Sequence, residues 1–289
     1  MSVNQVIQYG NLGHIIDCLT EKTLFIKKRF LEIFTKLGFG HTTSAFSCAE
    51  ITVVLWYHIM KYNVNDPSWV DRDRFVMSKG HAAGILFPIF EDIGFMTKGE
   101  MEETIRIGGD FSKLHQLFLP GYEFYGGSLG IGLGLSAGLA YGAKMNRETW
   151  LTFTILGDAE CYEGSIWEAA MFAGHNRLNN LIVIVDRNYL GITDFTENML
   201  ALEPFEDKWK SCNWDVIRIN GHNLCEILDT FSGIRSRKSS KPLCIIAETI
   251  KGNSIEFMSN INLMHGVVPK GSDIERAYND LNKYYNKSE

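Results

Sequence analysis

Two polar residues follow two apolar segments of the chain and could together hold a metal ion. Gly157 and Asp158 come directly after the apolar run 150–156, and Asn188 comes shortly after the apolar run 180–185. If these runs are neighbouring parallel strands, Asp158 and Asn188 lie side by side at one edge of the sheet. They then offer one anionic and one neutral oxygen. Magnesium usually takes few protein ligands and binds phosphate oxygens as well, so this pair suits a cation that holds a phosphate.

A helix expected over residues 163–175 would add to this site, because it begins soon after Asp158. The first backbone N–H groups of a helix have no partner within the helix, and together with the helix dipole they attract anions. A cation beside a helix N-terminus makes a diphosphate site. The other interpretation is structural: Asp158 caps a helix and Asn188 sits in a turn. The two residues taken alone leave both interpretations open.

Short apolar runs that alternate with helices predict the elements that would position these residues. We expect an α/β fold of three layers, α/β/α, with a mainly parallel central sheet, because fully apolar strands separated by helices indicate a sheet covered on both faces. One domain over residues 1–289 is the default, since no linker or repeat is visible. Strands are expected at 74–78, 150–156, 180–185, 214–219 and 243–247, and helices at 14–38, 48–60, 163–175 and 222–235.

The segment 126–143 carries no charge, and its glycines Gly130, Gly134, Gly138 and Gly142 recur at every fourth position. Such spacing is typical of membrane helices that pack through small residues. However, so many glycines lower the hydropathy, and nothing else in the chain resembles a membrane protein. We therefore expect a buried helix whose glycine ridge lets another backbone come close.

Composition excludes several classes of partner. The 289 residues are 45% hydrophobic, which suffices for a sizeable core. The net charge of −6 and the pI near 5.8 argue against a protein that mainly binds nucleic acid or an anionic membrane. The six cysteines are scattered without a CxxC pair, and the N-terminus lacks the succession of a signal peptide. We expect a cytoplasmic protein with reduced cysteines that binds neither nucleic acid nor membrane.

The ordered motifs of the chain resemble those of transketolases, and specifically the thiamine-diphosphate-binding half of a split transketolase. The family motif GDG, followed further along by Asn, corresponds to Gly157-Asp158-Ala159 and Asn188. The WEA block at 167–169 and the NLI strand at 180–182 are also similar to the family. The remaining matches, in chain order, are Gly40-His41, Ser78-Lys79-Gly80-His81, Gly127-Ser128-Leu129-Gly130, Gly221-His222, Thr249-Ile250-Lys251-Gly252 and His265-Gly266.

The resemblance implies thiamine diphosphate and Mg²⁺ or Ca²⁺ as cofactors. Asp158, Asn188 and the backbone carbonyl of Leu190 would bind the cation that bridges the diphosphate. His41, His81 and His265 would surround the reacting carbons, where imidazoles can shuttle protons and stabilise alkoxides. The residues implied to contact the cofactor are Gly127, Leu129, Gly157, Asp158, Ala159, Glu160, Asn188, His81 and His265. Glu163, counted with the catalytic residues, and Glu168 match acids near the family's dimer interface that link the two cofactor sites.

The resemblance also implies a partner. In the family, the glutamate that activates the pyrimidine ring of the cofactor comes from a separate pyrimidine-binding domain, and the sequence ends at Glu289 without one. We therefore expect a second subunit that carries the pyrimidine and C-terminal domains, and a heterotetramer of two chains of each kind. The implied reaction is transfer of a two-carbon ketol unit from a ketose to an aldose, with sugars or sugar phosphates as substrates.

Four segments depart from the family pattern, and most of them surround the substrate. The second glycine of GDG is Ala159, GHPG reads Gly40-His-Thr-Thr43, and TIKGKG reads Thr249-Ile-Lys-Gly-Asn-Ser254. The LxGHP region, here 114–123, lacks GHP and leaves His115 as a candidate for the histidine that contacts substrate hydroxyls. We expect an altered donor or acceptor, in a specialised carbohydrate or natural-product pathway rather than central metabolism.

Three other functions compete with this one. The first is thiamine-diphosphate-dependent acyl transfer from a 2-oxo acid to a sugar. The second is a non-catalytic subunit that has kept the fold and lost the chemistry. The third, a nucleotide-binding dehydrogenase, is disfavoured because no GxGxxG motif follows a first strand.

Overall fold

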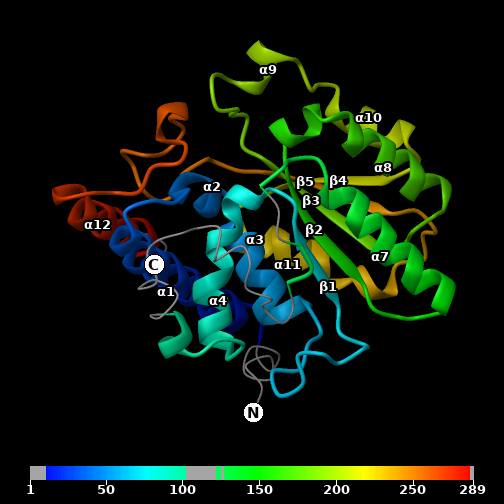
Figure 1. Cartoon of the computed structure of the whole chain (residues 1–289), viewed down its shortest axis with the longest axis horizontal. Coiled ribbons are helices and arrows are strands. Elements are labelled where there is room, and N and C mark those ends of the chain that lie inside the picture. The colour runs from blue at the N-terminus through cyan, green and yellow to red at the C-terminus, as the bar shows by residue number, and fades with distance from the viewer. Residues whose placement is uncertain (1–10, 102–121, 125–126, 287–289) are drawn as a thin grey trace.

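The computed structural model describes residues 11–101, 122–124 and 127–286, and helices lie on both faces of a central sheet (Figure 1). Each neighbouring pair of strands in this five-stranded sheet is parallel. The three-layer α/β/α fold is therefore confirmed. In sheet order the strands are β1 (Arg74–Met77), β2 (Thr152–Gly157), β3 (Leu181–Arg187), β5 (Leu243–Glu248) and β4 (Asp215–Asn220).

The central strands are mainly apolar, and both of their faces are buried. In β3, Val183 and Val185 belong to one core cluster, and Ile182 and Ile184 belong to the other. Figure 1 shows α7 (Gly132–Asn146) and α8 (Gly164–His175) together on one side of the sheet, and α1 (Leu12–Leu37), α3 (Ala49–Val54) and α4 (Leu86–Ile93) on the other. The first cluster contains residues of α7 (Gly132–Asn146), α8 (Gly164–His175) and α10 (Phe205–Ser211).

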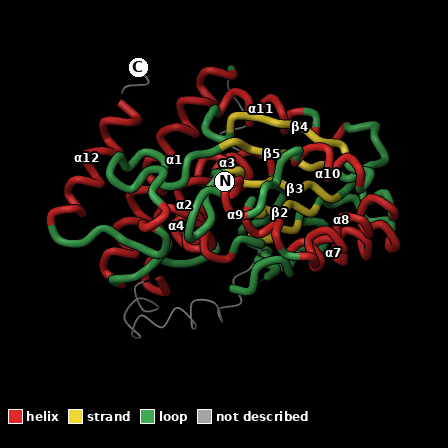
Figure 2. Tube along the Cα trace, turned by 90° about the horizontal axis from the view of Figure 1, so that it is seen from above, coloured by secondary structure: helices red, strands yellow, loops and turns green. Residues whose placement is uncertain are grey.

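The second and larger core cluster contains residues from most of the remaining helices. Helix α1 ends where the sequence predicts, at Gly38, whose φ of 77° is left-handed and suits glycine. Beyond its first residue, the predicted helix 48–60 forms as α3 followed by a π-helical turn, Leu55–Ile59. Helix α12 packs along α1 (Figure 2). The helices on this side are α1 (Leu12–Leu37), α2 (Thr42–Ser47), α3 (Ala49–Val54), α4 (Leu86–Ile93), α11 (Leu224–Ser232) and α12 (Ser272–Asn286).

Several short elements lie in the connections between strands and helices. The predicted helix 222–235 is shorter than expected, since α11 stops at Ser232 and a 3₁₀ turn follows. The short elements are α9 (Thr196–Met199) and the 3₁₀ turns Gly80–Ile85, Ala159–Tyr162, Ile234–Ser236 and Asn262–Met264.

The prediction that the glycine ridge packs against another backbone was wrong for the packing within this chain, although the helix itself forms as α7. A side chain at Gly134, Gly138 or Gly142 would meet nothing within 4 Å in the described structure. The buried residues are instead Gly132, Leu133, Ser136, Ala137, Ala140 and Ala143. Their helical spacing places most of the glycine ridge on the opposite, outward face. Among the described helices, none is long and apolar enough to cross a membrane.

Replacing both Gly134 and Gly138 by alanine is expected to raise the free energy of unfolding of this chain by about 1–2 kcal/mol. Both positions lie inside a helix and have room for a methyl group, and alanine loses less backbone entropy there than glycine. Denaturant titration of the double variant and the wild type measures the difference. The matched control is Gly132→Ala, whose methyl would lie 2.8 Å from the Ser78 Cα and should destabilise the chain. A double variant less stable than wild type would contradict the outward placement of the ridge.

Candidate active site

The carboxyl ends of β2 and β3 bring the expected metal ligands together. Gly157 pairs with Asp186 in the sheet, and the next N–H, that of Asp158, donates to the Asp186 carbonyl at 3.3 Å. The Asp158 carboxylate accepts the N–H of Tyr189 at 2.7 Å, so the loop carrying Asn188 and Leu190 folds back over it. One carboxylate, one side-chain amide oxygen and one backbone carbonyl would make an all-oxygen ligand set of the kind that suits Mg²⁺ or Ca²⁺.

Asp158 also fulfils the structural interpretation, because its side chain accepts the N–H of Ala159 at 2.8 Å as the N-cap of a 3₁₀ turn. The carboxyl is 1% exposed. Burial, and then the nearby Asp186, raise its pKa to about 6, while Arg187 opposes the rise. Arg187 is fully buried and lies 3.3 Å from the Asp158 carboxylate. It also pairs with Glu197 at 2.7 Å, so it ties Asp158 to the loop that follows β3.

Three histidines from separate loops form one cluster. His41 precedes α2, His81 lies in the turn Gly80–Ile85, and His265 follows the turn Asn262–Met264. Their ring centroids are 4.7 to 5.5 Å apart. Burial lowers the pKa of His265 to about 3, and Lys251 and the other two histidines add to the effect. The Nδ1 atom of His265 is buried without a hydrogen-bond partner among the described residues. His265 is therefore neutral near pH 7.

Lys251 is a site residue for which we predicted no role from the sequence. Its side chain is 4% exposed, and its Nζ lies 3.4 Å from the carbonyls of both Leu190 and Gly191. Burial lowers its pKa to about 8, and Lys79 contributes in the same direction. A buried cation next to the Leu190 carbonyl favours an anionic ligand at this position. The TIKG segment contained the residue, but a lysine after a strand is usually exposed, so its burial could not be inferred.

A second buried lysine, Lys79, connects several of the segments that contribute residues to the site. Its ammonium pairs with Asp186, which also accepts the hydroxyl of Ser47 at 2.5 Å and that of Thr249. Burial alone would lower the pKa of Lys79, but Asp186 outweighs it and raises that pKa. The pair is therefore ionised. It joins the loop after β1 to α2 and to the ends of β3 and β5.

Glu160 connects three motifs by accepting hydrogen bonds from protein groups. Its carboxylate is 2% exposed and accepts the Ser78 hydroxyl at 2.5 Å and the N–H groups of Gly130 and Gly157, both at 2.9 Å. Among the other expected cofactor contacts, Gly127 is exposed and Leu129 is half-buried. The three family segments SKGH, GSLG and GDAE are thus connected through one buried carboxylate.

Two expected residues stand apart from the histidine cluster. Glu163 is exposed and lies beside Gly130, and Glu168 is exposed on α8. Both carboxylates are accessible to a neighbouring protein chain. His115 lies outside the described residues.

Comparison with known proteins shows the family of this chain. The family described as "Transketolase, thiamine diphosphate binding domain" matches residues 22–286. The chain belongs to the transketolase family. This transketolase domain is 35% identical over 263 residues to one subunit of the apulose-4-phosphate transketolase of Phocaeicola vulgatus, covering 91% of this chain and 93% of the relative. It is 37% identical over 234 residues to the 6-deoxy-6-sulfo-D-fructose transketolase subunit SqwG of a Clostridium species, covering 80% and 84%.

A solved transketolase has the same fold as this transketolase domain. The transketolase from Leishmania mexicana superposes with a TM-score of 0.78 at 25% identity, covering 93% of this chain but 44% of that chain. The domain therefore matches most of the length of the two subunits and less than half of the Leishmania chain.

The described residues fit a diphosphate and its cation. The oxygen ligand set around Asp158 suits the cation, and the Lys251 ammonium can pair with phosphate oxygens. The unpartnered Nδ1 of His265 offers a further hydrogen bond.

The methyl group of Ala159 is expected to have a small effect on cofactor binding. Its backbone is not in the left-handed region, so glycine is not required for its conformation. Ala159→Gly should change the affinity for thiamine diphosphate by less than about fourfold, the equivalent of one methyl group. Calorimetric titration in the presence of Mg²⁺ and the partner chain measures the change. A gain of twentyfold or more would mean that the methyl obstructs the diphosphate.

Proposed function

We propose that this chain binds thiamine diphosphate with Mg²⁺ or Ca²⁺ and, together with a partner chain, transfers a two-carbon ketol unit from a ketose to an aldose. Family membership supports the reaction class. The observation that carries the proposal for this chain is the convergence of the Asp158 ligand set, buried Lys251 and three histidines at one sheet edge.

Each residue has a role that its surroundings support. Asp158, Asn188 and the Leu190 carbonyl hold the cation, and Lys251 with His81 and His265 binds the diphosphate. Gly157, Ala159, Gly127 and Leu129 line the remainder of the cofactor site, and Glu160 acts through its three hydrogen bonds. Bound thiamine diphosphate supplies the electron sink for breaking and forming the carbon–carbon bond. The cluster of His41, His81 and His265 moves protons to and from the sugar hydroxyl and carbonyl oxygens.

Two apolar surfaces support an assembly with a partner and a second copy. The first lies at the rim of the site, where Asn262 ties the two contributing loops by donating to the Thr193 carbonyl at 2.7 Å. It comprises Ile192, Phe195, Met199, Leu200, Ile261 and Leu263. We assign it to the partner that carries the pyrimidine-binding domain. Both relatives named above are called subunits, which supports this assignment.

The second surface covers the outer sides of α7 and α8, with Tyr141 and Phe172 in ring contact at 5.5 Å. Its exposed apolar residues are Ile131, Tyr141, Met145, Met171 and Phe172. Glu163 and Glu168 lie on the same side of the molecule, on or beside α8. We assign this surface to a second copy of the chain, which completes a heterotetramer of two chains of each kind. In that assembly Glu163 would link the two cofactor sites.

The substrate is proposed as a ketose, free or phosphorylated, other than the usual pentose phosphates. The two relatives are named for different sugars, which supports variation of specificity on this scaffold. We further infer a single domain over the whole chain and a reducing, cytoplasmic location. The six unpaired cysteines support that location.

Reconstitution of the two-chain complex tests the function. The chain, its pyrimidine-domain partner, thiamine diphosphate and Mg²⁺ are incubated either with a panel of ketoses and aldoses or with pyruvate and the same aldoses. We expect a product lengthened by two carbons from a ketose, and none from either chain alone. Turnover of pyruvate without use of any ketose would replace ketol transfer by acyl transfer. Cofactor binding without turnover of either donor would indicate a non-catalytic subunit.

A further inference from the structure

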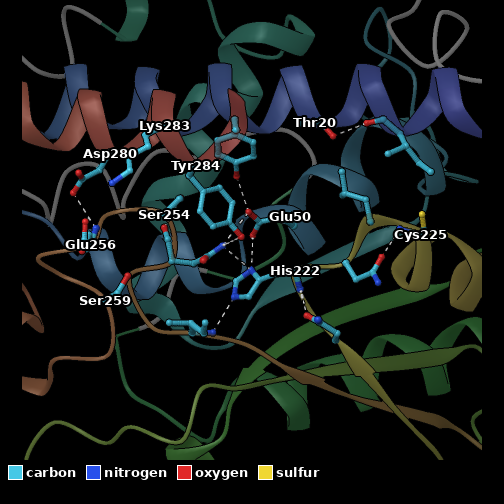
Figure 3. A pocket seen from close by; sticks show the side chains of 17 residues that line it. Thr20, Glu50, His222, Cys225, Ser254, Glu256, Ser259, Asp280, Lys283 and Tyr284 are labelled. Carbon is cyan, nitrogen blue, oxygen red and sulfur yellow. Dashed lines mark hydrogen bonds and ion pairs between the residues drawn. The ribbon is translucent and has the colours of Figure 1, made fainter. Parts of the chain in front are cut away.

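Behind the candidate active site, a cavity of about 900 Å³ opens between α1, α11, α12 and the loop after β5. Figure 3 shows Glu50, His222 and Tyr284 pointing toward one another on its inner wall. These residues do not belong to the site described above. They are connected to it through the segment Thr249–Gly252, which carries Lys251.

Glu50 is the centre of a buried polar network. It is 3% exposed and accepts hydrogen bonds from Lys27 at 2.6 Å and Tyr285 at 2.7 Å through one oxygen. The other oxygen lies 3.0 Å from the Nδ1 of His222. Burial alone would raise the pKa of Glu50, but Lys27 and His222 hold it below its usual value. Glu50 is therefore an ionised carboxylate, and each of its two oxygens has a hydrogen-bond partner.

The hydrogen bonds of His222 determine which of its nitrogens carries the proton. The N–H of Ile250 donates to its Nε2 at 2.8 Å, so Nε2 has no proton. A neutral imidazole has one N–H, so Nδ1 carries the proton and donates it to Glu50; the side-chain amide of Asn253 also lies 3.0 Å from this nitrogen. Glu50 thereby sets the tautomer that His222 needs to accept from the backbone of Ile250. Gly221 allows this approach, because a side chain there would come within 2.5 Å of Thr249.

The segment Thr249–Gly252 is held at several points, and His222 holds the one next to Lys251. Thr249 donates its N–H to the Arg187 carbonyl at 3.1 Å, and Gly252 donates to the Thr43 carbonyl at 2.9 Å. Between them, the N–H of Ile250 is bound by His222. The direction of the peptide between Thr249 and Ile250, one residue before Lys251, therefore depends on an imidazole nitrogen outside the active site.

We propose that His222 is a positioning residue that, oriented by Glu50, holds the backbone of Ile250 so that Lys251 reaches the carbonyls of Leu190 and Gly191. The proposal rests on the proposed function for its effect on cofactor binding, but its structural part stands on the hydrogen bonds alone. Removing the Ile250 contact lets the segment rotate and moves the Lys251 ammonium away from the diphosphate.

Two substitutions separate the two nitrogens of His222. His222→Gln places an oxygen near the position of Nε2, so it still accepts from Ile250 but loses the donor to Glu50. His222→Asn places an amide near the position of Nδ1, so it still donates to Glu50 but leaves Ile250 without an acceptor. If His222 merely stabilised the fold, the effects of the two variants would not depend on which of the two imidazole nitrogens the new side chain replaces.

The test measures hydrogen exchange of the Ile250 amide in the chain and the dissociation constant of thiamine diphosphate with Mg²⁺ in the two-chain complex. For His222→Asn we expect exchange of Ile250 to quicken and the cofactor to bind about tenfold more weakly. For His222→Gln we expect both values to stay within about threefold of wild type. His222→Asn with wild-type exchange and affinity, or equal losses in both variants, would overturn the proposal.

The readouts also separate this proposal from the proposed function. If the wild-type complex binds no thiamine diphosphate, the proposed function fails, and the exchange of Ile250 in the two variants still decides the role of His222. If wild type binds the cofactor and the variants His222→Asn and His222→Gln behave alike, the role of His222 fails and the proposed function stands.

Discussion

Asp158→Asn is expected to weaken magnesium-dependent binding of thiamine diphosphate by at least about 100-fold, because changes to residues that merely support a metal ligand already cost 10–100-fold. Asparagine has the shape of aspartate and can still accept the N–H of Tyr189. The substitution removes the negative charge that attracts the cation and leaves the loop after β3 in place. Calorimetric titration of the two-chain complex with the cofactor, with and without Mg²⁺, measures the loss.

The control for this experiment makes the same chemical change at the other end of the sheet. Asp215 is the first residue of β4 and pairs with Arg237 at 2.7 Å. Asp215→Asn should leave cofactor affinity unchanged. Arg187 keeps Glu197 and Glu203 as partners, so Asp158→Asn should remain folded. An Asp158→Asn complex that binds the cofactor as wild type does would remove Asp158 from the metal site.

Lys27→Met is expected to lower the free energy of unfolding by about 3–5 kcal/mol, because it leaves a buried carboxylate without its cation. The Lys27 ammonium has no exposed surface and lies 2.6 Å from Glu50. Methionine has a similar length and cannot pair with the charge. Denaturant titration of the isolated chain at neutral pH measures the loss.

The pH dependence of this loss has a defined sign. Burial would raise the pKa of Glu50, but Lys27 and His222 hold it below its usual value. The ionised carboxylate therefore stabilises the fold above the pKa of the unfolded chain, and this stabilisation is lost as pH falls. The difference between wild type and Lys27→Met should shrink in acid. The matched control, Lys36→Met, breaks an exposed pair with Glu32 and should cost no more than about 1 kcal/mol. Equal losses in the two variants would contradict the importance assigned to the buried pair.

The sheet could be predicted from the sequence because its strands are continuous apolar runs between turns. The run 180–185 became β3, Leu181–Arg187, and the run 243–247 became β5, Leu243–Glu248. Both are buried on each face, so their composition decides their structure. The proximity of Asp158 and Asn188 followed from placing their strands next to each other, which the register of β2 and β3 confirms.

The rest of the site could not be predicted from local sequence. His41, His81 and His265 lie on three loops, and only the resemblance to a family grouped them in advance. Lys251 and Glu160 act through burial, which depends on how distant segments pack around them. The outward glycines of α7 were assigned to the wrong face, because four-residue spacing marks a ridge without saying which side meets the sheet. The role of His222 depends on which nitrogen is bound by a backbone N–H, which no motif encodes.

The central claim is that the ends of β2 and β3 form a thiamine diphosphate site. It is tested most directly by calorimetric titration of the wild-type two-chain complex with thiamine diphosphate in the presence of Mg²⁺. We expect saturable binding of one cofactor for each copy of this chain, abolished when the metal is chelated. Absence of binding at millimolar cofactor, with the partner and Mg²⁺ present, would contradict the claim.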